Sequence, residues 1–502
     1  VCYPCCGWNI GRFHLLSKYN GFIQMNSTNN IPLCVDLDGT LLKTDTLYEL
    51  LACVLKQQPW LLFVLPFWLM RGKHVLKREL SHRCQLNAAI LPINGEFLNF
   101  LRAEHARGRS LLLATGAYYD VAKAIADHYG FFDGVLATNE KQNLTGARKA
   151  ALLVEKFGEK GFDYAGNDTV DIPVWERARN SYLVNATPAT KASVSRQFHF
   201  SEVMDLQKKL SFKQMMKAIR LHQWAKNTLI FVPLLAAHQF MDITRLTDTM
   251  LAFLAFGCCA SFSYIINDIG DLEADRLHHS KYKRPFASAD ISIPAGLLLA
   301  LFLISATLFL VFFLPNGFIY SLLIYFMITN MYTLRLKYVP ILDVAILAGL
   351  YTLRVVAGGL AADVPTSFWL LAFSGFVFFS LAIVKRVSEL LGIETPDEKA
   401  VVCRGYWTSD IPVLLGLGAS SALIAVLVLA LYINSPDIVQ LYSSPRYLWL
   451  LCPIIALWLG RVWLITGRGQ MHDDPVVFAL RDRISWLLFG VAGMCLVIGA
   501  QL

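Results

Sequence analysis

The chain has 502 residues, of which 55% are hydrophobic and only 16% charged, a composition too apolar for an ordinary soluble protein. Its formal net charge of +8 matters less than its distribution, because Lys and Arg near the ends of apolar spans decide which loops stay in the cytoplasm. We therefore expect a membrane protein and no nucleic-acid partner. Residues 1 to about 212 have the mixed composition of a globular domain, whereas the remainder is a series of long apolar runs, so we expect at least two domains.

The amino-terminal stretch, residues 1–25, begins with Val1 and ends at Met25, and we interpret it as a non-native or disordered extension. No cleavable signal peptide is evident. The stretch contains Cys2, Cys5 and Cys6, but the other cysteines are scattered and form no second cluster that would complete a zinc site or a disulfide framework.

The first predicted strand lies in "IPLCVDLDGTLL" at 31–42, an apolar run that delivers Asp36 and Asp38 to its carboxyl end. Open α/β sheets bind their ligands at the carboxyl ends of the strands. Three later segments supply further polar residues: Thr115 ends a strand in "SLLLATGAYY", Lys149 lies in "TGARKAALL", and Asp168 and Asp171 end a strand in "FDYAGNDTVDIPVW".

Residues 44 to about 95 are too long for a simple crossover and predict a helical cap. Within them, "PWLLFVLPFWLM" at 59–70 is apolar for 12 residues, which is too short to span a bilayer. We favour packing of this stretch inside the cap. The alternative is that it enters the membrane surface, helped by Arg71, Lys73 and His74.

The D-x-D-G-T sequence at 36–40, followed in order by the three later segments, resembles the phosphatases of the haloacid dehalogenase superfamily. The resemblance implies a Rossmann-like α/β domain over residues 26–205, in which Asp36 attacks phosphorus and Asp38 protonates the leaving alcohol and then activates water. Thr115 and Lys149 would hold the phosphoryl oxygens. The implied Mg²⁺ ligands are the Asp36 carboxylate, the Asp38 backbone carbonyl, Asp168 and Asp171.

The carboxyl-terminal part, residues 213–502, contains apolar runs that are long enough to cross a bilayer. We predict nine spans, at about 224–240, 249–266, 292–314, 318–334, 339–361, 366–384, 411–433, 447–466 and 484–502. Alternate connecting loops are rich in Lys and Arg, and by the positive-inside rule these loops are cytoplasmic. We expect an integral protein of a bacterial cytoplasmic membrane, with the amino-terminal domain and all the acidic chemistry facing the cytoplasm.

The loop after the second span, "NDIGDLEADRLHHSKYKR", concentrates acids and then bases. On one helix Asn267, Asp271 and Asp275 would share a face, with Asp268 beside them. Oxygen ligands without His or Cys suit Mg²⁺, which takes one or two carboxylates and phosphate oxygens. We therefore expect a Mg²⁺-diphosphate here. The alternative is a solvated helix end whose acids pair with the basic residues that follow.

This spacing resembles the first aspartate-rich motif of the UbiA prenyltransferase superfamily, whose members have nine membrane helices and bind Mg²⁺-diphosphate there. Within the superfamily the chain is most similar to decaprenyl-phosphate phosphoribosyltransferases, over nearly all of residues 213–502. Further motifs that carry the resemblance are "RLHQWAKN", "YTLRLKYVPILDVAILAGLYTLRVVAGG", "KRVSEL", "CRGY" and "RGQMHDDPVVFALRDR".

The second aspartate-rich motif expected for a prenyl diphosphate donor is missing, and Lys385 and Arg386 stand in its place. Such cations suit a bare phosphate, as in phosphoribosyl pyrophosphate or a polyprenyl phosphate. Other cations proposed for these phosphates are Lys226, Lys283, Arg284, Lys337, Arg404 and the intramembrane Arg354. For Arg354 the structural alternative is snorkelling to the interface or pairing with Asp343 on the same helix.

The resemblances together imply a bifunctional membrane enzyme. It would transfer phosphoribose from phosphoribosyl pyrophosphate to polyprenyl phosphate and then remove the 5-phosphate, using Mg²⁺. One alternative is a prenyltransferase that uses a polyprenyl diphosphate and an aromatic or other small acceptor. Another is a transporter or lipid-binding module, against which the acids lie at helix ends and not near the bilayer midplane.

Overall fold

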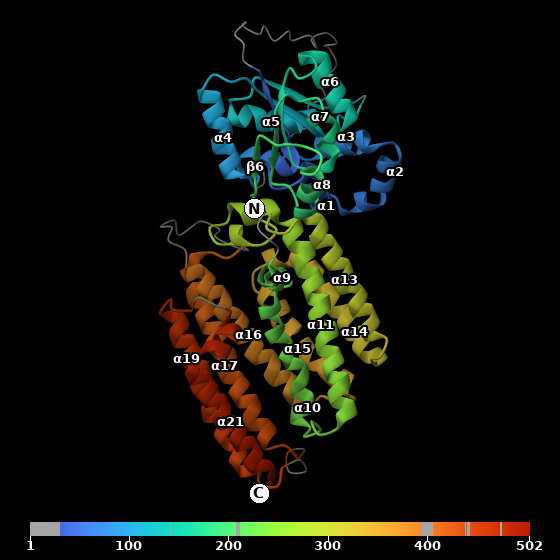
Figure 1. Ribbon diagram of the computed structural model, residues 1–502. Coiled ribbons are helices and arrows are strands. Elements are labelled where there is room, and N and C mark those ends of the chain that lie inside the picture. The colour runs from blue at the N-terminus through green and yellow to red at the C-terminus, as the bar shows by residue number, and fades with distance from the viewer. Residues whose placement is uncertain are drawn as a thin grey trace, which may run out of the picture.

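The computed structural model describes residues 31–140, 142–206, 211–392, 405–436, 438, 442–471 and 474–501. An α/β domain stands at one end of a bundle of long helices (Figure 1). The interpretation of residues 1–25 as an extension, and the proposed role of Arg404, concern positions outside these residues.

The α/β domain is built on a six-stranded parallel sheet in the order β3-β2-β1-β4-β5-β6. The strands are β1 (Leu33–Val35), β2 (Leu111–Tyr118), β3 (Gly134–Thr138), β4 (Asp163–Gly166), β5 (Ser181–Val184) and β6 (Glu202–Met204). In register, Val35 lies between Leu113 of β2 and Ala165 of β4. Because parallel strands present their carboxyl ends at one edge, the residues after β1, within β2 and after β4 meet there.

Side chains alternate across the central strands, so both faces of the sheet are buried. Leu33 and Val35 pack on one side, and Cys34 packs on the other. The helices that cover these faces are α4 (Gly95–Ala106), α5 (Tyr119–Tyr129), α6 (Ala147–Phe157), α7 (Ile172–Trp175) and α8 (Pro188–Val194). The predicted doubly covered parallel sheet is therefore observed.

The segment between β1 and β2 is helical, as predicted for a cap. It contains α1 (Thr46–Gln57), η2 (Pro59–Phe63), α2 (Leu65–Met70), α3 (Lys73–Arg83) and η3 (Ala88–Ile90). A disulfide joins Cys53 of α1 to Cys84, 31 residues later at the end of α3. The sequence did not reveal this pair, because neither cysteine belongs to a cluster.

The apolar stretch at 59–70 does not pack inside the cap as we expected. Only Leu61 and Trp68 are buried, and six other large apolar side chains are more than half exposed. A short helical segment has one inward face, so a run that is apolar all round must leave the rest uncovered.

The helical domain has eight helices that are long and apolar enough to cross a membrane, among the residues that the structure describes. They are α11 (Ile243–Gly270), α13 (Ile293–Val311), α14 (Asn316–Leu334), α15 (Leu342–Ala362), α16 (Phe368–Leu391), α17 (Ile411–Ile433), α19 (Leu451–Gly467) and α21 (Arg483–Gln501). Shorter elements connect them: α9 (Phe212–Ala218), α12 (Leu272–Leu277), η6 (Lys281–Lys283), η7 (Leu336–Tyr338), η8 (Thr408–Asp410), η9 (Pro445–Leu450) and α20 (Pro475–Arg481).

The first of the nine predicted spans, 224–240, is the one that differs. It forms the 3₁₀ segment η5 (Leu221–Phe231) followed by the short helix α10 (Val232–Ala236). The polar residues Lys226 and Asn227 turn inward to partners in the bundle. Gly358 of α15 allows the close approach, because a Cβ there would lie 2.0 Å from the Ile230 carbonyl oxygen.

The two domains meet through α1 of the cap (Figure 1). Tyr48 and Ala52 pack into an apolar cluster formed by the ends of α11 and α13 with α12. Beside them the Glu49 carboxylate accepts hydrogen bonds from both terminal nitrogens of Arg276, at 2.7 and 3.0 Å, and both side chains are buried. The cap therefore rests on the same loop that carries the acidic motif.

Candidate functional site

The first candidate site lies at the carboxyl edge of the sheet. Asp36 follows β1 directly, and Asp38 lies in the turn η1 (Leu37–Leu41), where its Oδ1 accepts a hydrogen bond from the Thr46 amide at 2.8 Å. Both carboxylates line a cavity of about 350 Å³. Gly39 continues the turn with a φ of +75°, a backbone conformation that favours glycine.

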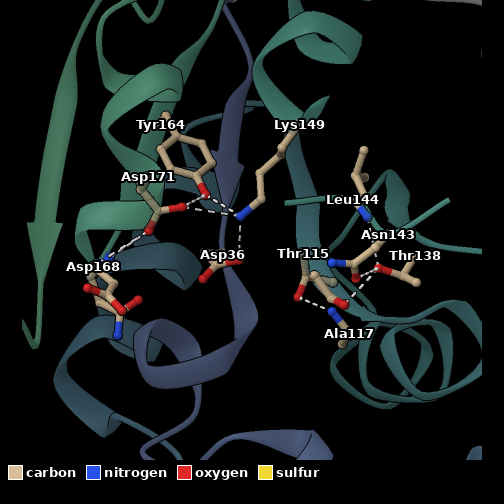
Figure 2. A network of polar contacts seen from close by, with 12 residues as sticks. Asp36, Thr115, Ala117, Thr138, Asn143, Leu144, Lys149, Tyr164, Asp168 and Asp171 are labelled. Carbon is tan, nitrogen blue, oxygen red and sulfur yellow. Dashed lines mark hydrogen bonds and ion pairs between the residues drawn. The ribbon is translucent and has the colours of Figure 1, made fainter. Parts of the chain in front are cut away.

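Lys149 of α6 connects the acids of this site (Figure 2). Its Nζ lies 2.9 Å from Asp36 Oδ1 and 3.3 Å from Asp171 Oδ1, and it donates to the Tyr164 hydroxyl at 2.7 Å. Tyr164 in turn donates to Asp171 Oδ1 at 2.7 Å. The sequence did not single out Tyr164, because a tyrosine inside a buried strand gives no motif signal.

Burial determines the protonation states of Asp36 and Asp38. Removal from water, offset in part by Lys149, raises the pKa of Asp36 to about 6. Burial, and then the nearby charge of Asp45, raises the pKa of Asp38 to about 8. At neutral pH Asp36 is thus mainly a carboxylate, and Asp38 is mainly a carboxylic acid that can donate a proton.

Thr115 is held behind the cavity and does not line it. It is fully buried, and its Oγ1 accepts a hydrogen bond from the Ala117 amide at 3.0 Å (Figure 2). The next residue, Gly116, lines the cavity instead. Lys77 of the cap helix α3 also reaches it, donating to the Gly116 carbonyl oxygen at 2.5 Å. Lys77 belongs to no motif and was not predicted.

The two acids of the last phosphatase motif both line the cavity, but they differ in exposure. Asp171 is buried against Lys149 and Tyr164, whereas Asp168 is exposed and its Oδ1 accepts from the Thr169 amide at 2.6 Å. Asn167, which lies between Gly166 and Asp168, comes close to the turn of the first motif. A Cβ on Gly39 would lie 2.1 Å from the Asn167 side-chain nitrogen, so Asn167 stands directly over that turn.

The second candidate site is the acidic loop at the junction. The predicted single helix breaks there, because α11 ends at Gly270 and α12 begins at Leu272. Asp268 and Asp275 still meet, since Arg284 Nη1 lies 3.0 Å from Asp268 Oδ1 and 2.7 Å from Asp275 Oδ2. The alternative pairing of these acids with the basic residues that follow is thus observed at Arg284.

Arg220 and Lys56 complete the charge balance of this loop. Arg220, just before η5, donates through two nitrogens to Asp268. Asp271 turns toward the cap of the α/β domain, where Lys56 Nζ of α1 lies 2.6 Å from its Oδ1. Asn267 is half-buried near the end of α11. Asp271 is therefore paired with the cap, whereas Asp268 and Asp275 share Arg284.

A third polar cluster joins three distant segments. Asp474 Oδ2 lies 2.7 Å from Lys226 Nζ and 3.3 Å from Lys385 Nζ. Burial raises the pKa of Asp474, but the two lysines outweigh it and lower the pKa to about 2. Two of the predicted phosphate-binding lysines are thus brought together. Asp474 lies in the "MHDDP" sequence, whose similarity to the family was its only signal.

The two predicted arginines of the helix interior have protein partners. Arg354 donates from Nε to Asn227 Oδ1 at 3.0 Å and from Nη2 to the Tyr325 hydroxyl at 3.1 Å, so its suggested pairing with Asp343 is wrong. Asp343 instead pairs with the buried Arg386, with Nε 2.5 Å from Oδ2. A charged group in a span requires such partners.

The remaining predicted cations lie nearer to the surface. Lys283 is exposed, and its Nζ lies 5.4 Å from the centroid of the Tyr282 ring. Lys337 is half-buried, with its Nζ 5.2 Å from the centroid of the Tyr338 ring. Among the ion pairs that the structure describes, none joins either lysine to an acid of the loop at 267–284.

The donor set of each acidic site can be compared with what Mg²⁺ requires. In the part of the chain that the structure describes, no three His, Cys, Asp or Glu side chains converge. Mg²⁺ needs only one or two carboxylates when waters and phosphate complete its shell. The Asp36 carboxylate with the Asp38 carbonyl and the Asn167 amide, and the pair Asp268 and Asp275, are therefore suitable donor sets.

Two sequence families match the chain. The haloacid dehalogenase-like hydrolases match residues 33–161, and the UbiA prenyltransferase family matches residues 228–498. The second match covers just over half of the chain. The two matches fall on the α/β domain and on the helical domain, respectively.

Three relatives extend these matches. The uncharacterized protein y4nM of Sinorhizobium fredii is 34% identical over 494 residues, which cover 97% of this chain and 95% of the relative. Nodulation protein NoeC of Azorhizobium caulinodans is 31% identical, covering 55% of this chain and 90% of the relative. Decaprenyl-phosphate phosphoribosyltransferase of Mycolicibacterium smegmatis is 28% identical, covering 55% and 88%.

Proposed function

The chain belongs to the UbiA prenyltransferase family and carries an amino-terminal haloacid dehalogenase-like domain, and from this premise we propose a bifunctional enzyme. The helical domain transfers phosphoribose from phosphoribosyl pyrophosphate to a polyprenyl phosphate such as decaprenyl phosphate. The soluble domain then removes the 5-phosphate. The similarity to decaprenyl-phosphate phosphoribosyltransferases supports this choice of donor and acceptor.

One observation carries the pairing of the two reactions. The cavity that contains Asp36 and Asp38 is lined on another side by Ser292, Ile293 and Pro294, at the start of the membrane helix α13. A phosphatase for soluble metabolites would gain nothing from such a wall. A phosphomonoester anchored in the bilayer by its lipid tail would be presented to the cavity at this point.

The transfer step requires charge stabilisation rather than a general base. The acceptor phosphate is already an anion, and its oxygen forms a bond to the anomeric carbon as the bond to pyrophosphate breaks. Mg²⁺ held by Asp268 and Asp275 would neutralise charge on the departing pyrophosphate. Arg220 and Arg284, which lie against these carboxylates, would contact phosphate oxygens in a bidentate manner.

The cluster of Lys226, Lys385 and Asp474 would bind a second phosphate of the substrates. Its two ammonium groups share one carboxylate, so the cluster has a surplus of one positive charge. Either the 5-phosphate of the donor or the phosphate of the acceptor could be held there. This surplus is the feature that favours a ribosyl donor over a prenyl diphosphate donor, which would require acids at this position.

The phosphatase step uses groups whose protonation is already suited to it. The Asp36 carboxylate attacks phosphorus, and the protonated Asp38 gives its proton to the leaving 5-oxygen of the ribose. Asp38 then removes a proton from the water that hydrolyses the aspartyl-phosphate. Lys149, 2.9 Å from Asp36 Oδ1, orients the nucleophile and contacts phosphoryl oxygens.

The orientation in the membrane follows from the charged loops. The acidic loop and the soluble domain lie on one side of the helical domain (Figure 1), and the loops on that side carry the excess of Lys and Arg. The positive-inside rule places this side in the cytoplasm of a bacterial cell. Phosphoribosyl pyrophosphate, a cytoplasmic metabolite, would reach both sites from there.

The test uses the purified protein in lipid nanodiscs with Mg²⁺, decaprenyl phosphate and isotope-labelled phosphoribosyl pyrophosphate. Mass spectrometry should find a labelled decaprenyl-phosphoryl ribose, and Asp36→Asn should accumulate its 5-phosphate. A parallel reaction with a polyprenyl diphosphate and an aromatic acceptor tests the prenyltransferase alternative. Product only in that reaction would refute the ribosyl donor, and an unchanged product from Asp36→Asn would refute the coupled phosphatase.

A further inference from the structure

The cap exposes an uninterrupted group of large apolar side chains. We call this group the apolar strip: Trp60, Leu62, Phe63, Phe67, Leu69 and Met70 of η2 and α2. These side chains are between 51% and 85% exposed, with Phe63 and Met70 at the upper end. Contiguous apolar surface of this kind on a water-soluble domain marks an interaction site.

The position of the strip is fixed by the helix that precedes it. Lys56, near the end of α1, lies 2.6 Å from Asp271, and Asp271 follows the last residue of the membrane helix α11. The strip begins at Pro59, three residues after Lys56. Since a chain extends by at most about 3.6 Å per residue, Pro59 lies within roughly 11 Å of Lys56 along the backbone. In Figure 1, α2 projects from the side of the soluble domain above α13.

The composition of the strip and of its border selects a partner. From Pro59 to Met70 there is no charged residue, and Arg71, Lys73 and His74 follow at once. The Arg71 guanidinium carbon lies 5.1 Å from the Phe67 ring centroid, so the positive charge stands at the edge of the apolar surface. Trp and Phe beside Lys and Arg are typical of segments that lie in the interface of a bilayer with anionic lipids.

We propose that the apolar strip enters the headgroup and upper acyl region of the bilayer that surrounds the helical domain, with Arg71 and Lys73 against anionic headgroups. Twelve residues cannot cross the bilayer, so the strip lies in its surface. The following helix α3 carries Lys77 into the phosphatase cavity. Binding of the strip to the bilayer therefore holds α3, and with it Lys77 in the cavity wall, at a fixed position relative to the lipid. This inference does not depend on the identity of the substrates.

The experiment introduces a photoreactive residue into the full-length protein. Phe63→p-benzoylphenylalanine and Met70→p-benzoylphenylalanine are compared with Val203→p-benzoylphenylalanine, which is an exposed apolar position on the sheet strand β6. Each variant is reconstituted in nanodiscs of phosphatidylcholine and phosphatidylglycerol and irradiated, and phospholipid adducts are quantified by mass spectrometry. We expect about tenfold more adduct at positions 63 and 70 than at 203.

Three results would overturn the proposal: adducts at 63 and 70 no more abundant than at 203, cross-links from these positions to a second copy of the chain, or cross-links only within one chain. A second measurement tests the basic border. Arg71→Glu combined with Lys73→Glu should lower the adduct yield at position 63 severalfold in nanodiscs that contain phosphatidylglycerol, and much less in pure phosphatidylcholine. An equal yield in both lipids would refute the role of anionic headgroups.

Discussion

The two acidic sites differ in how their charges are compensated. In the α/β site, Asp36 and Asp171 share Lys149, Lys77 is the cation that acts on Asp38, and burial raises the pKa values of Asp36 and Asp38. In the membrane loop three acids meet three cations, and each cation comes from a different segment. Those pairs are Asp268 with Arg220, Asp275 with Arg284, and Asp271 with Lys56.

The difference indicates two ways of handling a phosphorylated substrate. A site with surplus carboxylates can accept a divalent cation and keep one acid protonated for proton transfer. In a balanced site the ion pairs can separate when the substrate binds, because the carboxylates can then bind a cation and the guanidinium groups can bind the phosphate.

The largest effect is expected at the nucleophile of the soluble site. Asp36→Asn removes the attacking carboxylate and should lower hydrolysis of a phosphomonoester by about a thousandfold or more, because nothing else can form the covalent intermediate. The transferase rate, measured as pyrophosphate release, should stay within about twofold of the parent value. Equal loss of both activities would show that the two sites are not separate.

A substitution in the membrane loop should have the opposite pattern of effects on the two activities. Asp268→Asn leaves Arg220 and Arg284 without their shared carboxylate and should lower pyrophosphate release by about a hundredfold, with little change in phosphatase activity. The matched control is Glu273→Gln, an exposed acid of the same loop. If the control loses as much activity as Asp268→Asn, the loop acts through total charge and not through defined contacts.

The contact between the cap and the helical domain can be disrupted without replacing any acid of the two candidate sites. Glu49→Arg places a second positive charge against the buried Arg276, and loss of such a pair costs about 3–5 kcal/mol. We expect a lower melting temperature for the soluble domain and partial recovery in the double variant Glu49→Arg with Arg276→Glu. Lys56→Ala, at the exposed pair with Asp271, should change stability by less than about 1 kcal/mol. Similar losses from both single variants would contradict this ranking.

The smallest expected effect distinguishes the roles of the neighbouring residues Asn167 and Asp168. Asn167→Ala should raise the Mg²⁺ concentration for half-maximal phosphatase activity by about tenfold, because Asn167 stands over the turn that would hold the proposed Mg²⁺. Asp168→Ala removes a turn cap, which is worth about 1 kcal/mol of stability, and should leave the Mg²⁺ dependence nearly unchanged. The reverse order would favour Asp168 over Asn167 as the Mg²⁺ ligand.

The soluble domain could be predicted well because its geometry is local. A buried strand fixes where its last residues lie, so Asp36 and Asp38 could be placed at the sheet edge from the apolar run that precedes them. Lys149 followed from the order of motifs. Lys77, Tyr164 and Asn167 could not be found in this way, since their roles depend on how the cap and the turn after β4 fold over the edge.

The membrane domain was predicted at the level of its spans and much less at the level of its contacts. Hydropathy finds apolar helices reliably, but it misread 224–240, whose Lys226 and Asn227 bind partners more than a hundred residues away. Helical spacing placed Asp271 with Asp275, but it gave no sign that Asp271 pairs with Lys56 of the distant cap. Arg386 was assigned to a phosphate because it stands where a second aspartate-rich motif was expected. Its contact with Asp343, 43 residues earlier, leaves no sign in a single sequence.

The disulfide between Cys53 and Cys84 makes the cap sensitive to its redox environment. It joins α1, which holds the acidic loop through Lys56, to the end of α3, which carries Lys77 into the phosphatase cavity. Closing a loop of this length lowers the entropy of the unfolded cap by an amount equivalent to about 4 kcal/mol. In a reducing compartment the two sulfurs would be thiols, and the connection between the two sites would rest on packing and ion pairs alone.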